Sequence, residues 1–135
     1  MIDLNKILIR RISKNDLQGV IDILQDISVY TPPKIKHKNI WIKYSKQKNV
    51  FGYCFFYEKK LIGFGSLNFE MKLKKGLMAY LEDIVVHREF RGKKIGKLIN
   101  KTTFNRSDLF VKEASCFDKY LQIANTVPNF ANSAG

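Results

Sequence analysis

The stretch 80–101 constrains the fold of this chain more than any other. Residues 81–86 are mostly β-branched or apolar and predict a short strand. A basic turn that contains a glycine follows at 90–94. From Ile95 onward, apolar residues recur at the i, i+3, i+4 spacing of one helix face. The predicted order is therefore a strand, a basic turn and a helix.

This order suits the binding of an anion. The first turn of a helix presents unpaired backbone N–H groups and the positive end of the helix dipole. Gly92 lets a ligand approach the backbone closely, and the cationic residues around it are Arg91, Lys93, Lys94 and Lys97. The turn therefore predicts a phosphate or pyrophosphate site. It is neither a Walker A loop, which ends in Gly-Lys-Ser/Thr, nor a dinucleotide fingerprint, which has a different glycine pattern.

Residues 91–96, Arg-Gly-Lys-Lys-Ile-Gly, resemble the pyrophosphate-binding motif Arg/Gln-x-x-Gly-x-Gly/Ala of the GCN5-related N-acetyltransferases (GNAT). Arg91 and Gly96 match, and Lys94 replaces the middle glycine. The preceding Leu-Glu-Asp-Ile-Val-Val is similar to the glucosamine 6-phosphate N-acetyltransferase branch, in which that glycine is not always present. The alternative is an ordinary strand, turn and helix with a solvated basic turn. The coincidence of the Glu-Asp pair with the turn favours the resemblance.

The resemblance implies an α/β (α+β) fold of the GNAT acyl-CoA N-acyltransferase type, a mixed and mostly antiparallel sheet flanked by helices. The hydrophobic pattern predicts the element order β-α-α-β-β-β-α. Ser13 and Asp16 predict a capped helix start. Gly63 and Gly65 predict a bulge or a close backbone approach within a strand.

The resemblance also implies a set of site residues. Acetyl-CoA is the expected co-substrate, with no metal, and its thioester carbonyl is polarised by backbone N–H groups around a bulge in the fourth strand. The cofactor-binding residues implied are Ile84, Val85, Val86, Arg91, Gly92, Lys93, Lys94, Ile95, Gly96 and Lys97. The implied catalytic pair is Glu82 and Asp83, which also contact the sugar. Glu82 accepts the amine proton directly or through water, and the two side chains are expected on opposite strand faces.

Further substrate contacts are expected outside the fourth strand. Ser28 matches a hydroxyl residue near the acceptor sugar, and its alternative is a partly exposed polar helix end. Three lysines in the turn before the fourth strand could bind the sugar phosphate or simply be solvated: Lys72, Lys74 and Lys75. The partner implied is a small-molecule amino sugar phosphate, together with a possible homodimer.

The composition bounds the other partners. The chain has 135 residues and a formal net charge of +12. Lys and Arg are scattered, and the sequence has no zinc finger, RNP motif or KH-type loop, so we expect no nucleic-acid partner. A positive field would steer anionic acetyl-CoA and a sugar phosphate instead. The chain has no long apolar run or signal peptide, and Cys54 and Cys116 have no metal-site spacing, so we expect a cytoplasmic protein without stable membrane association.

The resemblance covers roughly 7–99. The family's fifth strand, and the later helix whose tyrosine protonates the leaving thiolate, have no match in the sequence that follows. We therefore expect a C-terminally incomplete N-acetyltransferase domain at 1–119 and an irregular tail at 120–135. A frameshift after Lys119 would explain the departure, since codons open to the tail include a set that encodes Asp-Cys in a shifted frame.

The expected function is the transfer of acetyl from acetyl-CoA to the amine of D-glucosamine 6-phosphate, in UDP-N-acetylglucosamine biosynthesis. Two alternatives stay open. One is a GNAT acetyltransferase with another amine acceptor, and the other is a truncated homologue that binds acetyl-CoA without turnover. A nucleic-acid-binding domain is a further interpretation that only the net charge supports.

Overall fold

The computed structural model of the chain describes residues 2–106 and 122–123. In chain order the elements are β1 (Leu8–Arg11), α1 (Leu17–Leu24), α2 (His37–Ser45), β2 (Val50–Tyr57), β3 (Lys60–Lys72), β4 (Gly76–Val86), α3 (Ile95–Asn105) and β5 (Gln122–Ile123). Short 3-10 turns occur at Leu4–Lys6, Lys14–Asp16, Lys34–Lys36 and Arg88–Phe90. The predicted order of elements is confirmed through α3.

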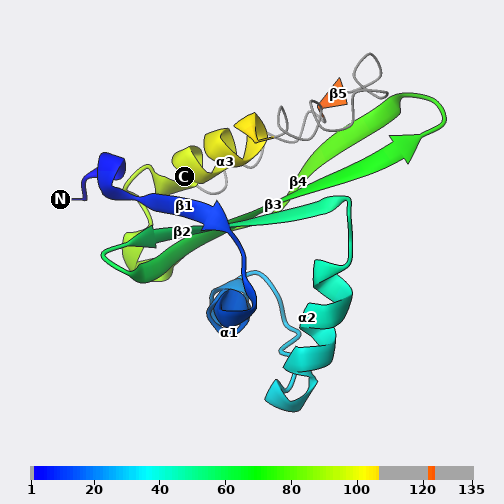
Figure 1. Cartoon of the computed structure of the whole chain (residues 1–135). Helices are drawn as coiled ribbons and strands as arrows, with labels where there is room; N and C mark the ends of the chain where they lie inside the picture. The colour runs from blue at the N-terminus through cyan, green and yellow to red at the C-terminus, as the bar shows by residue number, and fades with distance from the viewer. Residues whose placement is uncertain (1, 107–121, 124–135) are drawn as a thin grey trace.

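The strands form one sheet in the order β1-β2-β3-β4-β5. The first four strands are antiparallel to their neighbours, and β5 is parallel to β4. Figure 1 shows α1 and α2 on one face of this sheet and α3 on the other. The expected mixed, mostly antiparallel sheet with flanking helices is therefore confirmed.

Each face of the sheet has its own apolar core. On the α3 face, Ile95 and Ile99 of the helix pack against Leu67 and Ile84 of the strands. On the α1 face, the helix contributes Val20 and Ile23, which pack with three strand residues, Cys54, Phe64 and Val85. Burial raises the pKa of the Cys54 thiol to about 12, so this thiol stays protonated in the core.

The two glycines of β3 lie under α3. A Cβ atom on Gly65 would stand 2.6 Å from Thr103 Oγ1 and 3.0 Å from Ile99 Cγ2, and one on Gly63 would collide with Ile99. Glycine at these positions therefore lets the helix approach the sheet closely. The predicted close backbone approach is confirmed.

The start of α1 is held by polar contacts. Asp16 Oδ2 accepts hydrogen bonds from the Ser13 N–H at 2.8 Å and from Ser13 Oγ at 2.9 Å. Arg10 of β1 donates to both carboxylate oxygens of Asp16, at 2.6 and 2.8 Å. The predicted pairing of Ser13 with Asp16 is confirmed, and the additional arginine ties the helix to the edge strand.

Two residues of the expected irregular tail, Gln122 and Ile123, form the short strand β5. Gln122 pairs with Met78 and Ile123 pairs with Ala79, so that β5 lies beside the first half of β4. Two residues are too few to produce a recognisable alternation in the sequence, and their pairing depends on the backbone groups that β4 offers at its edge. The division at residue 119 and the rest of the tail lie outside the described residues.

Candidate active site

A bulge in β4 is the feature around which the site is built. Phe64 of β3 pairs with Val85, and Ser66 pairs with Glu82. Gly65 is therefore opposed by two residues, Asp83 and Ile84. Asp83 has a φ of 52°, a left-handed conformation that Asp and Asn tolerate better than most residues. The resemblance implied a bulge at this place in the fourth strand, and the structure has one.

The bulge changes the direction of the acidic side chains. Phe64 and Ser66 are two residues apart in β3, so their side chains lie on the same face of the sheet. This is the α1 face, because Phe64 packs against that helix. Glu82 lies opposite Ser66, so it is on the same face. Asp83 also faces α1, since it lines a pocket with residues of that helix and of the loop that follows. The expectation of opposite faces is therefore wrong, because the extra residue interrupts the alternation.

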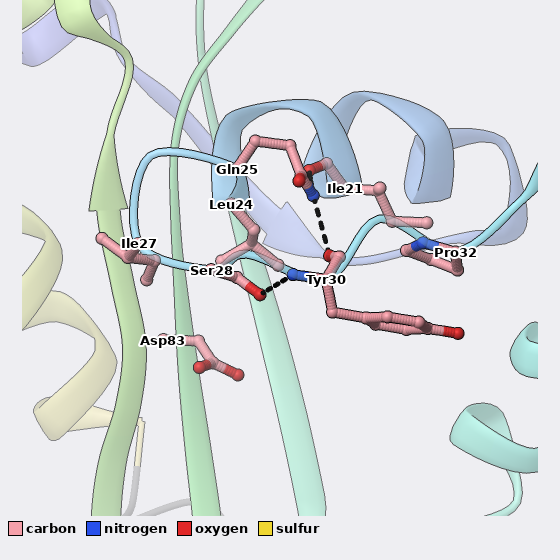
Figure 2. Close-up of a pocket in the computed structure, with 8 residues that line it drawn as sticks. All are labelled: Ile21, Leu24, Gln25, Ile27, Ser28, Tyr30, Pro32 and Asp83. Carbon is pink, nitrogen blue, oxygen red and sulfur yellow. Dashed lines mark hydrogen bonds between the residues drawn. The ribbon is translucent and has the colours of Figure 1, made fainter.

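The pocket lies between α1, the loop that follows it and β4 (Figure 2). Its lining is mostly apolar and includes one carboxylate, two hydroxyls and one amide. The lining residues are Ile21, Leu24, Gln25, Ile27, Ser28, Tyr30, Pro32 and Asp83. Two residues that the sequence analysis chose for the acceptor, Ser28 and Asp83, are thus brought together although they are far apart in the sequence. Glu82 does not line this pocket.

The loop after α1 is ordered by the side chain of Gln25. Gln25 Nε2 donates to the carbonyl oxygens of Ile21 at 3.0 Å and Tyr30 at 3.3 Å, and Thr31 Oγ1 donates to Gln25 Oε1. The Tyr30 N–H donates to Ser28 Oγ at 3.2 Å (Figure 2). Because Ser28 Oγ accepts this bond, its own hydroxyl hydrogen can point into the pocket.

Two ionisable groups near the pocket have shifted pKa values. Partial burial raises the pKa of the Asp83 carboxyl, because removal from water disfavours its charged form. Burial likewise raises the pKa of Tyr44 on α2 to about 12, and the negative charge of Asp83 adds to the rise. Tyr44 therefore stays a neutral O–H donor on the same side of the sheet as Asp83.

The basic turn contains two residues in the left-handed backbone conformation. Gly92 has a φ of 75° and Lys94 a φ of 64°. Lys94 immediately precedes α3 and thus occupies, in the left-handed conformation, the place of the motif's middle glycine. A Cβ on Gly92 would have no neighbour within 4 Å, so the space above this glycine is open.

The side chain of Arg91 lies between two anchors. Its Nε donates to the carbonyl oxygen of Val86 at 3.1 Å, and its Nη2 lies 2.8 Å from Asp26 Oδ2. Arg88 Nη2 lies 2.8 Å from the other oxygen, Asp26 Oδ1. These hydrogen bonds, that of Arg88 first, hold the pKa of Asp26 below its ordinary value.

The other residues expected at the cofactor divide into exposed lysines and buried apolar residues. The lysines of the turn, Lys93, Lys94 and Lys97, are exposed, and Lys93 Nζ lies 5.6 Å from the centre of the Phe90 ring. Ile84, Val85 and Val86 are buried, as are Ile95 and Gly96 at the start of α3. The structure therefore brings the end of β4, the basic turn and the helix start together at one end of the sheet.

The three lysines proposed for the sugar phosphate lie elsewhere. Lys72 ends β3, and Lys74 and Lys75 are exposed in the turn to β4. Lys72 Nζ pairs with Glu70 at 2.7 Å. Since strands rise about 3.3 Å per residue, Lys72 is roughly 23 Å along β3 from Gly65 and the bulge. Within the described chain these lysines are not part of the pocket.

Sequence reasoning missed residues that lie in or beside the pocket after α1. Gln25, Asp26 and Tyr30 were not chosen, and a pattern of neighbouring residues gives no signal for contacts that cross from one element to another. One available signal was the placement of Asp26 near the C-terminal end of a predicted helix, where a negative charge opposes the helix dipole and needs a cationic partner.

In the part of the chain that the structure describes, no three His, Cys, Asp or Glu side chains gather closely enough to hold a metal ion. Within residues 2–106 and 122–123, none of the helices has the length and apolar character needed to cross a membrane.

Comparisons with known proteins show the family. A search of curated proteins found no match. Among solved structures, glucosamine-6-phosphate N-acetyltransferase from Arabidopsis thaliana matches with a TM-score of 0.67 and 22% identity over 91% of this chain and 84% of that one. An aminoglycoside acetyltransferase from an uncultured soil metagenomic sample, in complex with sisomicin, has a TM-score of 0.61 and 19% identity over 96% and 88%.

A predicted acetyltransferase from Clostridium acetobutylicum, solved with acetyl-CoA, has a TM-score of 0.56 and 12% identity over 96% of this chain and 88% of that one. At these identities the neighbours show the fold. The sequence model of the acetyltransferase (GNAT) family matches residues 17–121, which is more than half of the chain. The protein therefore belongs to the acetyltransferase (GNAT) family, whose members transfer an acetyl group from acetyl-CoA to an amine.

Proposed function

We propose that this chain acetylates a small primary amine held in the pocket beside Asp83, and that D-glucosamine 6-phosphate is its acceptor. The observation that carries the proposal is the meeting of Ser28 and Asp83 in one pocket next to the β4 bulge. Both residues were chosen from the resemblance to glucosamine 6-phosphate acetyltransferases. A solved structure with that activity in its name is also among the structural neighbours.

Acetyl-CoA fits the residues that follow the bulge, at the C-terminal end of β4. The open space above Gly92, the left-handed backbone at Lys94 and the free N–H groups at the start of α3 form a cradle for a pyrophosphate. Arg91, Lys93 and Lys97 would supply positive charge, and the backbone of Ile84, Val85 and Val86 would bind the thioester arm. When bound, acetyl-CoA supplies an activated acetyl group.

The chain's own residues then prepare the amine. A protonated amine has no lone pair for attack, so a base must hold its proton. Asp83 is the proposed base, since its carboxylate faces the pocket and its raised pKa brings it closer to that of the amine. Glu82, on the same face, remains a candidate for a base acting through water. The backbone N–H groups at the bulge would stabilise the charge that develops on the carbonyl oxygen.

A second candidate acceptor is an amine that carries an apolar group and no phosphate. Among the residues that the structure describes, neither Lys nor Arg lines the pocket, and Lys72 lies far from it. The mouth of the pocket also exposes apolar surface at Ile27 and Tyr30, whose exposed fractions are 55% and 63%. These observations support an acceptor with an apolar body as the alternative to a sugar phosphate.

Thiol release from acetyl-CoA, measured with three matched acceptors, tests the proposal. We expect faster release with glucosamine 6-phosphate than with glucosamine, because a recognised phosphate should lower KM. Faster release with 2-phenylethylamine than with either sugar would establish the second candidate. An absence of release with every amine, despite binding of acetyl-CoA, would favour a non-catalytic homologue and contradict both.

Two variants connect the activity to the pocket. Ser28→Ala should raise KM for the acceptor about tenfold, the scale of one lost hydrogen bond to a polar group, while kcat changes little. Ser45→Ala is its control, since Ser45 ends α2 outside the pocket. Equal KM values for the two variants would contradict the placement of the acceptor beside Ser28.

A further inference from the structure

Asp26 joins two parts of the molecule that are distant in the sequence. Its carboxylate oxygens bind Arg88, which begins the 3-10 turn after β4, and Arg91 of the basic turn, at 2.8 Å each. Asp26 itself follows α1, immediately before Ile27 and Ser28 of the pocket. One side chain thus links the basic turn to the loop that forms the pocket wall.

The position of Asp26 would be unfavourable without its two arginine partners. A carboxylate just after the C-terminal end of a helix faces the negative end of the helix dipole, which is unfavourable. The two arginines compensate for this, and the Asp26 side chain is only 19% exposed although its partners Arg88 and Arg91 are 73% and 48% exposed. The carboxylate therefore contacts both guanidinium groups at the protein surface.

The contact also fixes the direction of the Arg91 guanidinium. Nε is bonded to the carbonyl oxygen of Val86, the last residue of β4, and Nη2 is bonded to Asp26. Among the described residues, neither of these bonds uses Nη1. A guanidinium held along one edge in this way keeps its remaining N–H groups available for an anion.

We propose that Asp26 is a positioning residue, which orients Arg91 toward the pyrophosphate of acetyl-CoA and holds the acceptor-pocket loop against the same turn. Binding at the basic turn and at the pocket is then coupled through Asp26. The inference depends on the proposed function, because it places the cofactor at the turn and the acceptor at the pocket.

The direction of the effect separates this role from simple electrostatics. Asp26 is negative and lies beside a turn proposed to bind an anion, so removal of its charge alone would strengthen binding of coenzyme A. Loss of a positioning contact would weaken it. We expect Asp26→Asn to weaken the binding of coenzyme A about fivefold, the scale of one partly screened charge-assisted hydrogen bond.

The experiment compares Asp26→Asn with Glu89→Gln by calorimetric titration with coenzyme A and with pantetheine, which lacks the pyrophosphate. Glu89 lies between the two arginines in sequence but pairs with Lys60 at 2.6 Å, so its variant removes the same charge and leaves Asp26 in place. We expect only Asp26→Asn to weaken coenzyme A binding, with pantetheine binding unchanged in both. Asp26→Glu should restore part of the affinity.

A second measurement reports on the pocket loop without any ligand. Hydrogen exchange of the amides at 25–31 should become faster in Asp26→Asn and stay unchanged in Glu89→Gln. Unchanged exchange together with unchanged or tighter coenzyme A binding in Asp26→Asn would overturn the positioning role of Asp26 but leave the proposed function standing. A wild-type chain that does not bind coenzyme A would overturn the proposed function and this coupling together.

Discussion

The two faces of the sheet at the β4 bulge are held together in different ways. On the α3 face, Ile99 and Thr103 pack onto the bare backbone of Gly65. On the α1 face, helix and loop are tied by ion pairs such as that of Arg10 with Asp16. The bulge directs Ile84 into the close-packed face and Asp83 into the open one. The close-packed face thus positions the strand at the bulge, while the other face forms the pocket.

The largest effect should come from a methyl group placed on the close-packed face. Gly65→Ala puts a Cβ 2.6 Å from Thr103 Oγ1 and 3.1 Å from Ile84 Cδ1, so buried groups must move. We expect a loss of about 2–3 kcal/mol in the free energy of unfolding, the upper range for overpacking. Urea denaturation measures it.

Gly19→Ala is the matched control on the other face. A Cβ at Gly19 of α1 would meet only the Leu61 Cδ2 atom, at 3.2 Å, and the end of this side chain can move. Helix propensity then dominates, and the variant should be up to about 1 kcal/mol more stable than wild type. Equal losses in Gly65→Ala and Gly19→Ala would remove the distinction between the faces.

A substitution in the open face should lower activity without destabilising the fold. Asp83→Asn keeps a side chain that tolerates the left-handed backbone and removes the proposed base. We expect kcat/KM to fall about 10²-fold, the lower range for general base catalysis. Steady-state kinetics with the best acceptor measures it, and a fall of less than threefold would exclude Asp83 as the base.

The same variant predicts a pH dependence of stability. Burial raises the pKa of Asp83, so the folded state binds its proton more tightly than the unfolded state does. Stability therefore falls as the pH rises between the unfolded and folded pKa values. Asp83→Asn should be more stable than wild type at neutral pH, and the two should converge in acid, where the carboxyl is protonated in both states.

The ion pair at the start of α1 should give the opposite pH dependence of stability. The hydrogen bond from Arg10 lowers the pKa of Asp16, so the stabilisation is present above the unfolded pKa and is lost as the pH falls through the folded pKa. Asp16→Asn should cost about 1–2 kcal/mol at pH 7, the range for loss of a helix cap. The difference from wild type should vanish in acid, and urea titrations at both pH values measure it.

Much of the secondary structure could be predicted from the sequence, because its signals are local. Alternation, helix spacing and the glycine pair are read within a few residues, and so are the capping partners Ser13 and Asp16. The basic turn was recognised by its motif. The face of the sheet on which the side chains of Glu82 and Asp83 lie could not be predicted, since a bulge is defined by pairing with Gly65 on another strand. Nor could the contact of Asp26 with Arg91, which joins residues far apart in the chain.

The smallest predicted effect concerns the turn that joins the two faces. Lys94 has a φ of 64° at a place where the family motif has glycine. A left-handed conformation costs an L-residue about 1–2 kcal/mol, and glycine escapes this cost but loses more entropy on folding. Lys94→Gly should therefore be more stable than wild type by about 0.5–1 kcal/mol, with Lys94→Asn between them, because Asn tolerates this conformation. Lys94→Ala is the control, because it keeps the strain and should gain nothing.

Thermal denaturation of the three variants ranks them. A gain in Lys94→Ala as large as that in Lys94→Gly would mean that loss of a positive charge, and not relief of backbone strain, stabilises the turn.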